Sequence, residues 1–297
     1  MRPILRPGLQ VLRRDVRTLQ LGLDWPGVAT ITDSPALRAV LDAIDGFRDT
    51  TGVVLAAADS GPAVDECRAA LDALFDAGAV IDQAATARTN LDEAAWAALW
   101  LLAGPDRDAR EVADARATCA VHVRGTGRIG DEVRRLLTDV PLLVAEDSTA
   151  AHVVLIAADH EPDRDKADQA MNDGLPHLWV LVRELVGVLG PFVLPGTTAC
   201  LRCVDAARAE LDPAWPTLVE SSTHRRGHVH ACDPLLATLM ATWAVHEVCV
   251  WASGLRPQSW DRTIEVPHGV GVVHSERYHP HPACGCGWSV WHDTMGA

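Results

Sequence analysis

The stretch that decides the fold reads GTTACLRC and spans residues 196–203. It places two residues between Cys200 and Cys203, and a second close pair, Cys284 and Cys286, ends the stretch HPACGC at 281–286. Two such pairs can complete a tetrahedral shell of four thiolates around Zn²⁺, at about 2.3 Å per sulfur. Proline and glycine around both pairs supply the tight turns that converging ligands need. The pattern therefore predicts a zinc ion that ties two distant parts of the chain together.

The ligand set leaves one alternative open, because the second pair is C-x-C and the commoner spacing is C-x-x-C. His279 and His281 are the substitute ligands that this alternative would use. A closed shell of four thiolates has no open coordination position, so we expect the zinc to be structural. The other cysteines each stand alone in an apolar stretch, as buried free thiols do; they are Cys67, Cys119, Cys232 and Cys249.

Composition limits the function classes. The chain has 297 residues, enough for about two domains, and 48% of them are hydrophobic. No apolar run approaches the roughly 18 residues of a membrane span, and residues 1–6 hold no apolar signal region, so we expect a cytoplasmic protein without a membrane partner. In that reducing compartment, eight cysteines favour metal binding or free thiols. The net charge of −14 repels phosphate backbones and argues against nucleic acid as a partner.

Residues 1–85 predict three strands followed by three helices. The strands are expected at 9–13, 18–23 and 28–32, because apolar and β-branched residues alternate there. Helices are expected from Ser34 to Gly46, at 53–58 and at 63–77, with apolar residues on one face. This order is typical of a winged-helix domain.

The charge of the last helix argues against DNA as the ligand of this domain, because four acidic residues accompany Arg68 on it. The same shape can capture a peptide as an added strand, with pockets beside the helix for its side chains. An accessory domain without a ligand is the alternative. Arg13, Arg14 and Arg17 either contact acidic groups of such a peptide or form a solvated face. The predicted peptide-binding residues are Val28, Ala29, Thr30, Ile31, Thr32, Val64, Arg68 and Leu71.

Residues 86–118 are expected to form a helical connector, and residues 119–297 an α/β domain. A buried-strand pattern at 119–123 runs directly into a G-x-G-x-x-G turn and an amphipathic helix. A second strand ends in acid about 20 residues later, where a ribose-binding carboxylate would lie. These features predict a Rossmann-like, doubly wound parallel sheet. The candidate nucleotide-binding residues are Gly125, Gly127, Gly130 and Glu146.

Four stretches together resemble one protein family: GPFVLPG at 190–196, CLRC at 200–203, DPAWP at 212–216 and HPACGC at 281–286. They are similar to the ThiF-like (ubiquitin-activating-type) partner proteins of thiazole- and oxazole-modified peptide biosynthesis, the route to modified microcins and other bacteriocins. The resemblance implies a winged-helix leader-peptide recognition domain joined to a ThiF-like domain with a zinc tetrathiolate. It also implies two partners, a ribosomally made precursor peptide and a separate YcaO-type cyclodehydratase that forms the azolines. A homodimer is a further option.

The sequence departs from ThiF-like adenylating enzymes between its second and third α/β strands. Those enzymes carry a long polar segment there that contacts ATP, whereas here three residues separate Asp147 from Ala151. We therefore expect no ATP, a glycine turn kept for architecture, and a non-catalytic recognition subunit. The alternative is an ATP-dependent adenylating enzyme that activates a carboxyl terminus, with Cys232 or Cys249 as thiol carrier. In this alternative, two histidines near Cys232 lower its thiol pKa at the start of a helix; the favoured interpretation is a helix-start cysteine with solvated neighbours. A winged-helix DNA regulator is the third hypothesis.

Overall fold

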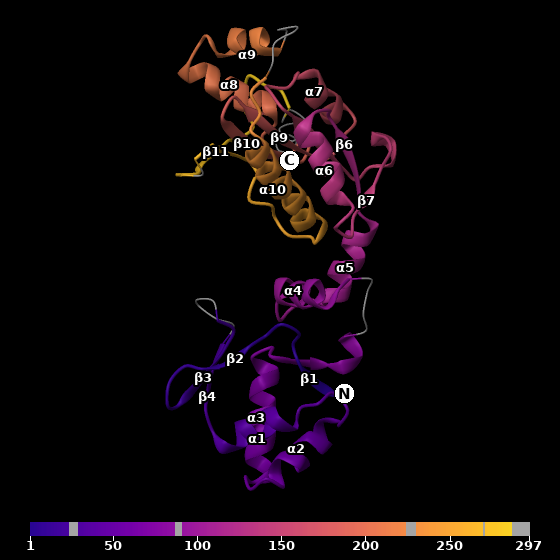
Figure 1. The fold of residues 1–297 in the computed structure, drawn as a ribbon, viewed down its shortest axis with the longest axis vertical. Helices are drawn as coiled ribbons and strands as arrows, with labels where there is room; N and C mark the ends of the chain where they lie inside the picture. The colour runs from indigo at the N-terminus through magenta and orange to yellow at the C-terminus, as the bar shows by residue number, and fades with distance from the viewer. Residues whose placement is uncertain (24–28, 87–90, 224–229, 270, 287–297) are drawn as a thin grey trace, which may run out of the picture. The chain divides into compact units, whose positions relative to one another are not determined.

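The structure is a computed structural model that describes residues 1–297 except 24–28, 87–90, 224–229, 270 and 287–297 (Figure 1). It divides into two compact units, residues 1–114 and 115–297. Each unit has its own buried apolar clusters, and each is described by itself.

The first unit begins with strands and continues with helices. Three antiparallel strands form a sheet in the order β2-β3-β4, and a separate pair joins β1 to β5. The three helices α1, α2 and α3 pack on one another (Figure 1). The elements are β1 (Pro3–Leu5), β2 (Val11–Arg13), β3 (Thr18–Leu21), β4 (Ala29–Thr32), α1 (Pro35–Ala43), α2 (Thr50–Ala58), α3 (Val64–Asp76) and β5 (Val80–Asp82).

This order of three strands and three helices follows the sequence prediction, whereas β1 and β5 were not predicted. The role of the unit as a winged-helix recognition domain stays a prediction. Residue Val28, predicted to begin the third strand, lies outside the described residues.

Local capping explains where the helices of this unit begin. The Ser34 hydroxyl accepts a hydrogen bond from the Leu37 amide, and Asp49 does the same for the Gly52 amide. The apolar faces of α1, α2 and α3 pack with the sheet in one core. This core contains Leu21, Leu37, Val40, Val53, Val54, Leu71 and Leu74. Burial of these side chains, at about 1.5–3 kcal/mol for each large one, provides the main favourable energy of the unit.

The stretch predicted as a connector is helical. It contains the 3-10 helix η1 (Gln83–Thr86), α4 (Glu93–Ala103) and α5 (Ala109–Thr118). Trp96 and Trp100 on α4 are buried edge to face, with ring centroids 5.9 Å apart. They pack with Val112 and Ala113 of α5, so this stretch has an apolar cluster of its own.

The second unit is built on a seven-stranded sheet in the order β12-β11-β10-β9-β8-β6-β7. The strands from β7 to β9 in this order run parallel, and those from β9 to β12 run antiparallel. The strands are β6 (Ala120–Arg124), β7 (Leu143–Val144), β8 (Val153–Ala158), β9 (His177–Arg183), β10 (Val186–Val193), β11 (Arg262–Pro267) and β12 (His274–Arg277).

The sheet is thus mixed, and the prediction of a parallel sheet is wrong for its second half. The reason is the turn between β9 and β10, which consists of Glu184, at φ 55°, and Leu185. Two residues can join antiparallel neighbours only, because a parallel connection needs a crossover of about a dozen residues or more. The unit is an α/β structure consistent with a Rossmann-like fold.

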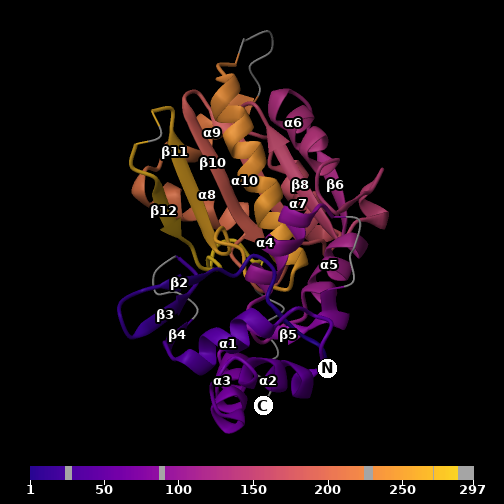
Figure 2. The same ribbon diagram turned by 60° about the horizontal axis from the view of Figure 1, so that its bottom comes forward.

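Helices cover both faces of this sheet. On one face lie α6 (Arg128–Leu137) and α10 (Pro234–Ala252), which share a core with β6, β8, β9 and β10. On the other lie α7 (Asp165–Asn172) and α8 (Leu201–Leu211), and α9 (Trp215–Thr223) packs on α8. Figure 2 shows α10 in front of the strands and α8 behind them.

Helix α10 is the one described helix that is long and apolar enough to cross a membrane. The expectation that no stretch approaches this length is therefore wrong for residues 234–252. Half of its 18-residue window is buried, and Met240, Ala244 and Val248 are fully enclosed against the sheet. The packing is that of a core helix, as its predicted all-round apolar pattern implies.

Candidate functional site

The four clustered cysteines meet in the second unit. Their sulfurs all lie within 4.8 Å of one another. Cys200 Sγ is 3.7 Å from Cys203 Sγ and 3.4 Å from Cys284 Sγ, and Cys203 Sγ is 3.3 Å from Cys286 Sγ. A tetrahedron with zinc–sulfur bonds of about 2.3 Å has sulfurs about 3.8 Å apart, so the donor set and its spacing fit a Zn²⁺ ion. We take this group as the candidate metal centre.

Local structure explains why these sulfurs converge. Cys200 precedes α8 and Cys203 lies in its first turn, where the positive end of the helix dipole favours thiolates. Gly285, at φ 76°, makes the turn between Cys284 and Cys286. Hydrogen bonds with the neighbouring cysteine sulfurs and from the His281 amide, 3.2 Å away, lower the pKa of Cys203.

The two histidines considered as substitute ligands lie elsewhere. The His281 ring accepts a hydrogen bond from the Ala283 amide at Nδ1 (3.2 Å) and faces Glu210 Oε1 with Nε2 (3.0 Å). His279 is exposed, and neither ring belongs to the group of possible ligands. The C-x-C pair supplies both remaining donors, so the four-thiol set is the better prediction.

The backbone amides that follow the glycine turn, at the start of α6, donate hydrogen bonds to a carboxylate of this same chain. The Asp159 carboxylate accepts hydrogen bonds from the amides of Arg128 (2.7 Å) and Ile129 (2.9 Å). In nucleotide-binding folds, amides at this helix end receive a phosphate. Here they already have an anionic partner, and a phosphate would meet the negative charge of Asp159.

Close packing explains the glycines without a nucleotide. A Cβ on Gly125 would lie 2.0 Å from the Ala157 carbonyl oxygen, and one on Gly127 would lie 2.4 Å from Asp159 Oδ2. Gly130 faces the Gly125 carbonyl, at 3.2 Å from such a Cβ. Gly125 and Gly127, both at positive φ, are thus required by the strand–turn–helix geometry, and Gly130 is closely packed in it.

The acidic end of β7 also has a structural partner. Asp147 caps the 3-10 helix η2 (Ser148–Ala150): its carboxylate accepts bonds from the Thr149 hydroxyl (2.6 Å) and amide (2.9 Å). These bonds hold the pKa of Asp147 below its usual range. Glu146, the predicted ribose-binding carboxylate, is exposed. Whether it contacts a ligand stays a prediction.

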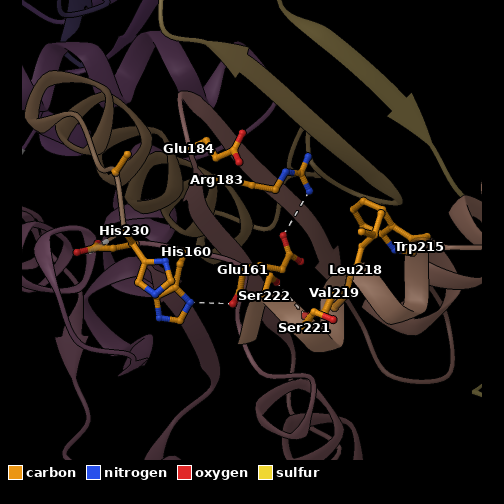
Figure 3. Close-up of a pocket in the computed structure, with 12 residues that line it drawn as sticks. His160, Glu161, Arg183, Glu184, Trp215, Leu218, Val219, Ser221, Ser222 and His230 are labelled. Carbon is orange, nitrogen blue, oxygen red and sulfur yellow. Dashed lines mark hydrogen bonds and ion pairs between the residues drawn. The ribbon is translucent and has the colours of Figure 1, made fainter. Parts of the chain in front are cut away.

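A cleft that sequence reasoning missed opens beyond the carboxyl ends of β8 and β9 (Figure 3). Its volume is about 750 Å³, and this is where α/β folds bind ligands. The lining residues are Asp159, His160, Glu161, Arg183, Glu184, Trp215, Leu218, Val219, Ser221, Ser222, His230 and Ala231. The signal in the sequence is that each buried strand ends in charged residues.

The cationic side chain of the cleft is already paired. Arg183 lies 3.3 Å from Glu161 and 3.3 Å from Glu265. Glu161 is also 2.6 Å from Arg164. The guanidinium groups of Arg183 and Arg208 lie 5.6 and 4.9 Å from the ring centre of Trp215. Because Arg183 already pairs with two carboxylates, it is poorly placed to neutralise the charge of a triphosphate in this cleft.

The two candidate thiol carriers are not activated. Burial and the nearby Asp159 raise the pKa of Cys232 to about 11, which favours the interpretation of a plain helix-start cysteine over a thiol activated by histidines. The His230 ring packs against His160, with centroids 4.3 Å apart and an angle of 31° between the rings, and His228 lies outside the described residues. Burial also raises the pKa of Cys249.

The predicted peptide-binding strand lies at the edge of its sheet. The Asp33 amide, just after β4, donates to the Arg17 carbonyl at 2.7 Å on the β3 side. Because backbone groups alternate along a strand, Ala29 and Ile31 point to β3 as well, and Thr30 and Thr32 point their N–H and C=O outward. Both threonines are exposed.

The predicted helix contacts of the peptide differ in exposure. Val64 is 43% exposed and Arg68 is exposed, one turn apart on the same face of α3. Leu71 is 3% exposed and packs in the core, where a peptide reaches it only after movement of its neighbours. The groove itself stays a prediction.

No family model matches the sequence, and no curated protein matches it. Solved structures share its fold. The heterocyclase TruD has a TM-score of 0.69 at 17% identity, and the match covers 96% of this chain and 42% of TruD. E. coli MccB with ATP has a TM-score of 0.68 at 14% identity, covering 97% of this chain and 100% of MccB.

The microcin C7 biosynthetic enzyme MccB in complex with N-formylated MccA gives 0.65 at 14% identity, with 97% and 100% covered. The chain thus spans less than half of the heterocyclase and the full length of MccB. At these identities the likeness shows the fold.

Proposed function

We propose that this chain is a non-catalytic recognition subunit. It binds the leader of a ribosomal precursor peptide and presents the peptide to a YcaO-type cyclodehydratase that makes azolines. In this account residues 1–85 bind the leader, residues 86–118 connect, and residues 119–297 form a truncated ThiF-like domain held by a zinc clamp. Fold likeness to a heterocyclase and to a microcin biosynthetic enzyme, together with the four sequence stretches, supports this assignment.

The observation that carries the proposal is the position of β4 at the edge of its sheet, where no strand among the described residues pairs with its outer side. The outward N–H and C=O groups of Thr30 and Thr32 can pair with an extended peptide, whose main chain supplies affinity with little dependence on sequence. Val64 and Arg68 on α3 would contact its side chains. In the predicted basic cluster, Arg13 pairs with Asp33 (3.4 Å) and Arg14 donates to the Gln20 side chain (2.8 Å). Arg17 is the member without a side-chain partner among the described residues.

The second candidate, an adenylating enzyme, is favoured by one observation. MccB, solved with ATP, is matched over its full length. Against it stand the Asp159 carboxylate on the loop amides, the committed Arg183 and the three-residue link at 148–150. The recognition subunit is therefore the better supported function.

The test is a titration of the full chain with a fluorescein-labelled leader of the precursor encoded beside its gene, followed by anisotropy. Thr30→Pro removes an outward N–H, so we expect leader affinity to fall about tenfold, equivalent to ~1.4 kcal/mol. The matched control Thr30→Val keeps the amide and should bind within about threefold. Ile31→Pro is a poorer test of the edge than Thr30→Pro. The Ile31 N–H points to β3, so its loss would damage the sheet itself.

Unchanged leader affinity in a folded Thr30→Pro variant would remove β4 as the binding edge. Circular dichroism of each variant distinguishes this outcome from unfolding.

A further inference from the structure

A second groove, separate from the cleft at β8 and β9, lies at the β12 edge of the seven-stranded sheet. It has a volume of about 420 Å³ and lies on the face of β11 and β12 that α10 covers only in part. Its lining residues are Trp243, Arg256, Pro257, Gln258, Trp260, Arg262, Ile264, Val273, Ser275 and Arg277. Three of these are arginines, and no described lining residue is acidic, although the chain as a whole carries a net charge of −14. The groove is thus a local cationic feature on an acidic protein.

The arrangement of two of these arginines is unfavourable for the free protein. Arg262 on β11 and Arg277 on β12 are direct cross-strand partners, so their Cβ atoms lie roughly 5 Å apart on one face. Like charges in this position destabilise a strand pair. Arg256 has a carboxylate partner, Asp261 at 3.1 Å, but within the described part of the chain neither Arg262 nor Arg277 has a side-chain hydrogen bond or ion pair. An anion between them would remove the repulsion.

The remainder of the groove is apolar and aromatic. Trp260 stacks on Phe192 and carries the Arg256 guanidinium 5.3 Å from its ring centre, while Trp243 and Ile264 complete the floor. Val273 at the rim is 42% exposed. A ligand that fits must therefore bring both negative charge and apolar side chains, which an inorganic anion does not.

The edge strand adds a way of holding such a ligand. β12 is the last strand of the sheet, and all four of its residues are exposed. An extended peptide can pair with such an edge, and its alternate side chains then point to the face that holds Ser275 and Arg277. The volume suits a short peptide segment, and nucleic acid is disfavoured by the charge of the chain.

We propose that this groove is a docking site for an extended acidic peptide segment, in which carboxylates bridge Arg262 and Arg277 and apolar side chains lie on Trp243 and Trp260. It is independent of the β4 edge, so each site can fail without the other.

The probe is a fluorescein-labelled synthetic hexapeptide that alternates glutamate and leucine, titrated into the full chain. We expect saturable binding that weakens as salt rises from about 50 to about 200 mM. The analogue with glutamine at each glutamate position should bind at least about tenfold more weakly. Arg262→Gln and Arg277→Gln should each reduce the affinity about tenfold. Arg135→Gln is the matched control, because it removes the same charge from an arginine that already has Glu132 and Asp139 as partners, and it should leave binding unchanged.

Thermal melting provides a readout that a structural role would not give. Removing one of two repelling charges should leave the melting temperature unchanged or raise it, while binding is lost. A lower melting temperature in both variants, with unchanged peptide binding, would show that the arginines hold the sheet and would overturn the proposal. So would equal binding of the glutamine analogue, or displacement of the probe by inorganic phosphate or by a single-stranded oligonucleotide at equal concentration.

Discussion

At the scale of single residues, Asp159 decides how the glycine turn is used. Its carboxylate holds two amides at the start of α6, which the sequence could not reveal, because Asp159 is about thirty positions away and meets the turn only when β6 and β8 pair. The sequence correctly indicated the strand, the turn and the helix around Gly125 and Gly127. The role of the turn depends on a partner that no local pattern contains.

We expect Asp159→Ala to lower the free energy of unfolding of the second unit by about 1 kcal/mol, as loss of a helix cap does. Urea unfolding followed by circular dichroism measures this. Asp131→Ala is the control: it removes an exposed carboxylate from the same helix, paired with Arg134 at 3.5 Å, and should cost little. Equal costs for the two variants would contradict the capping role.

His177 gives a pH dependence at the same scale. Its side chain is fully buried, its Nδ1 faces the Leu175 carbonyl at 2.9 Å, and burial lowers its pKa to about 4. The unfolded chain takes up this proton near pH 6.5 and the folded one only near pH 4. Stability should therefore be full above about pH 6.5 and fall by roughly 3 kcal/mol as the pH decreases to about 4.

Urea unfolding at several pH values checks this prediction. In His177→Leu the fall between these pH values should become smaller, whatever the variant costs at neutral pH. An unchanged pH slope would assign the effect to other groups.

At the scale of elements, the cysteine stretches join the start of α8 to residues 281–286. We expect the purified chain to hold about one zinc ion, and Cys284→Ser to lose it and to destabilise the second unit, because an opened thiolate shell loses both metal and link. Elemental analysis and thermal melting measure the two effects.

Cys232→Ser is the control for this prediction, since its half-buried thiol lies outside the cluster and its replacement should leave the zinc content unchanged. A chain purified without a metal-binding tag that contains no zinc would contradict the assignment.

Elements with a clear apolar periodicity could be predicted from the sequence. Elements that depend on pairing or packing with a distant segment could not. The capped apolar helix α10 and the strand pair β9–β10 follow from their sequences. Strand β12 reads HSER and has no apolar periodicity, so it exists through its pairing with β11. Helix α7 reads DKADQAMN, and its two buried alanines gave no clear helical signal.

At the scale of the whole molecule, the two proposals place one peptide-binding edge on each unit and assign the use of ATP to another protein. The first unit contains the edge strand β4. The second contains the four-cysteine cluster, the glycine turn whose neighbouring amides donate to Asp159, and the groove at β12 lined by three arginines. The proposed division of labour requires that ATP be used by a separate cyclodehydratase.

Calorimetric titration of the full chain with Mg-ATP, with and without the precursor peptide, tests this claim most directly. The account predicts binding heat from the precursor alone and none from the nucleotide in either case, because Asp159 holds the loop amides and Arg183 is paired. Micromolar binding of Mg-ATP, or release of pyrophosphate when the peptide is present, would contradict it and favour an adenylating enzyme.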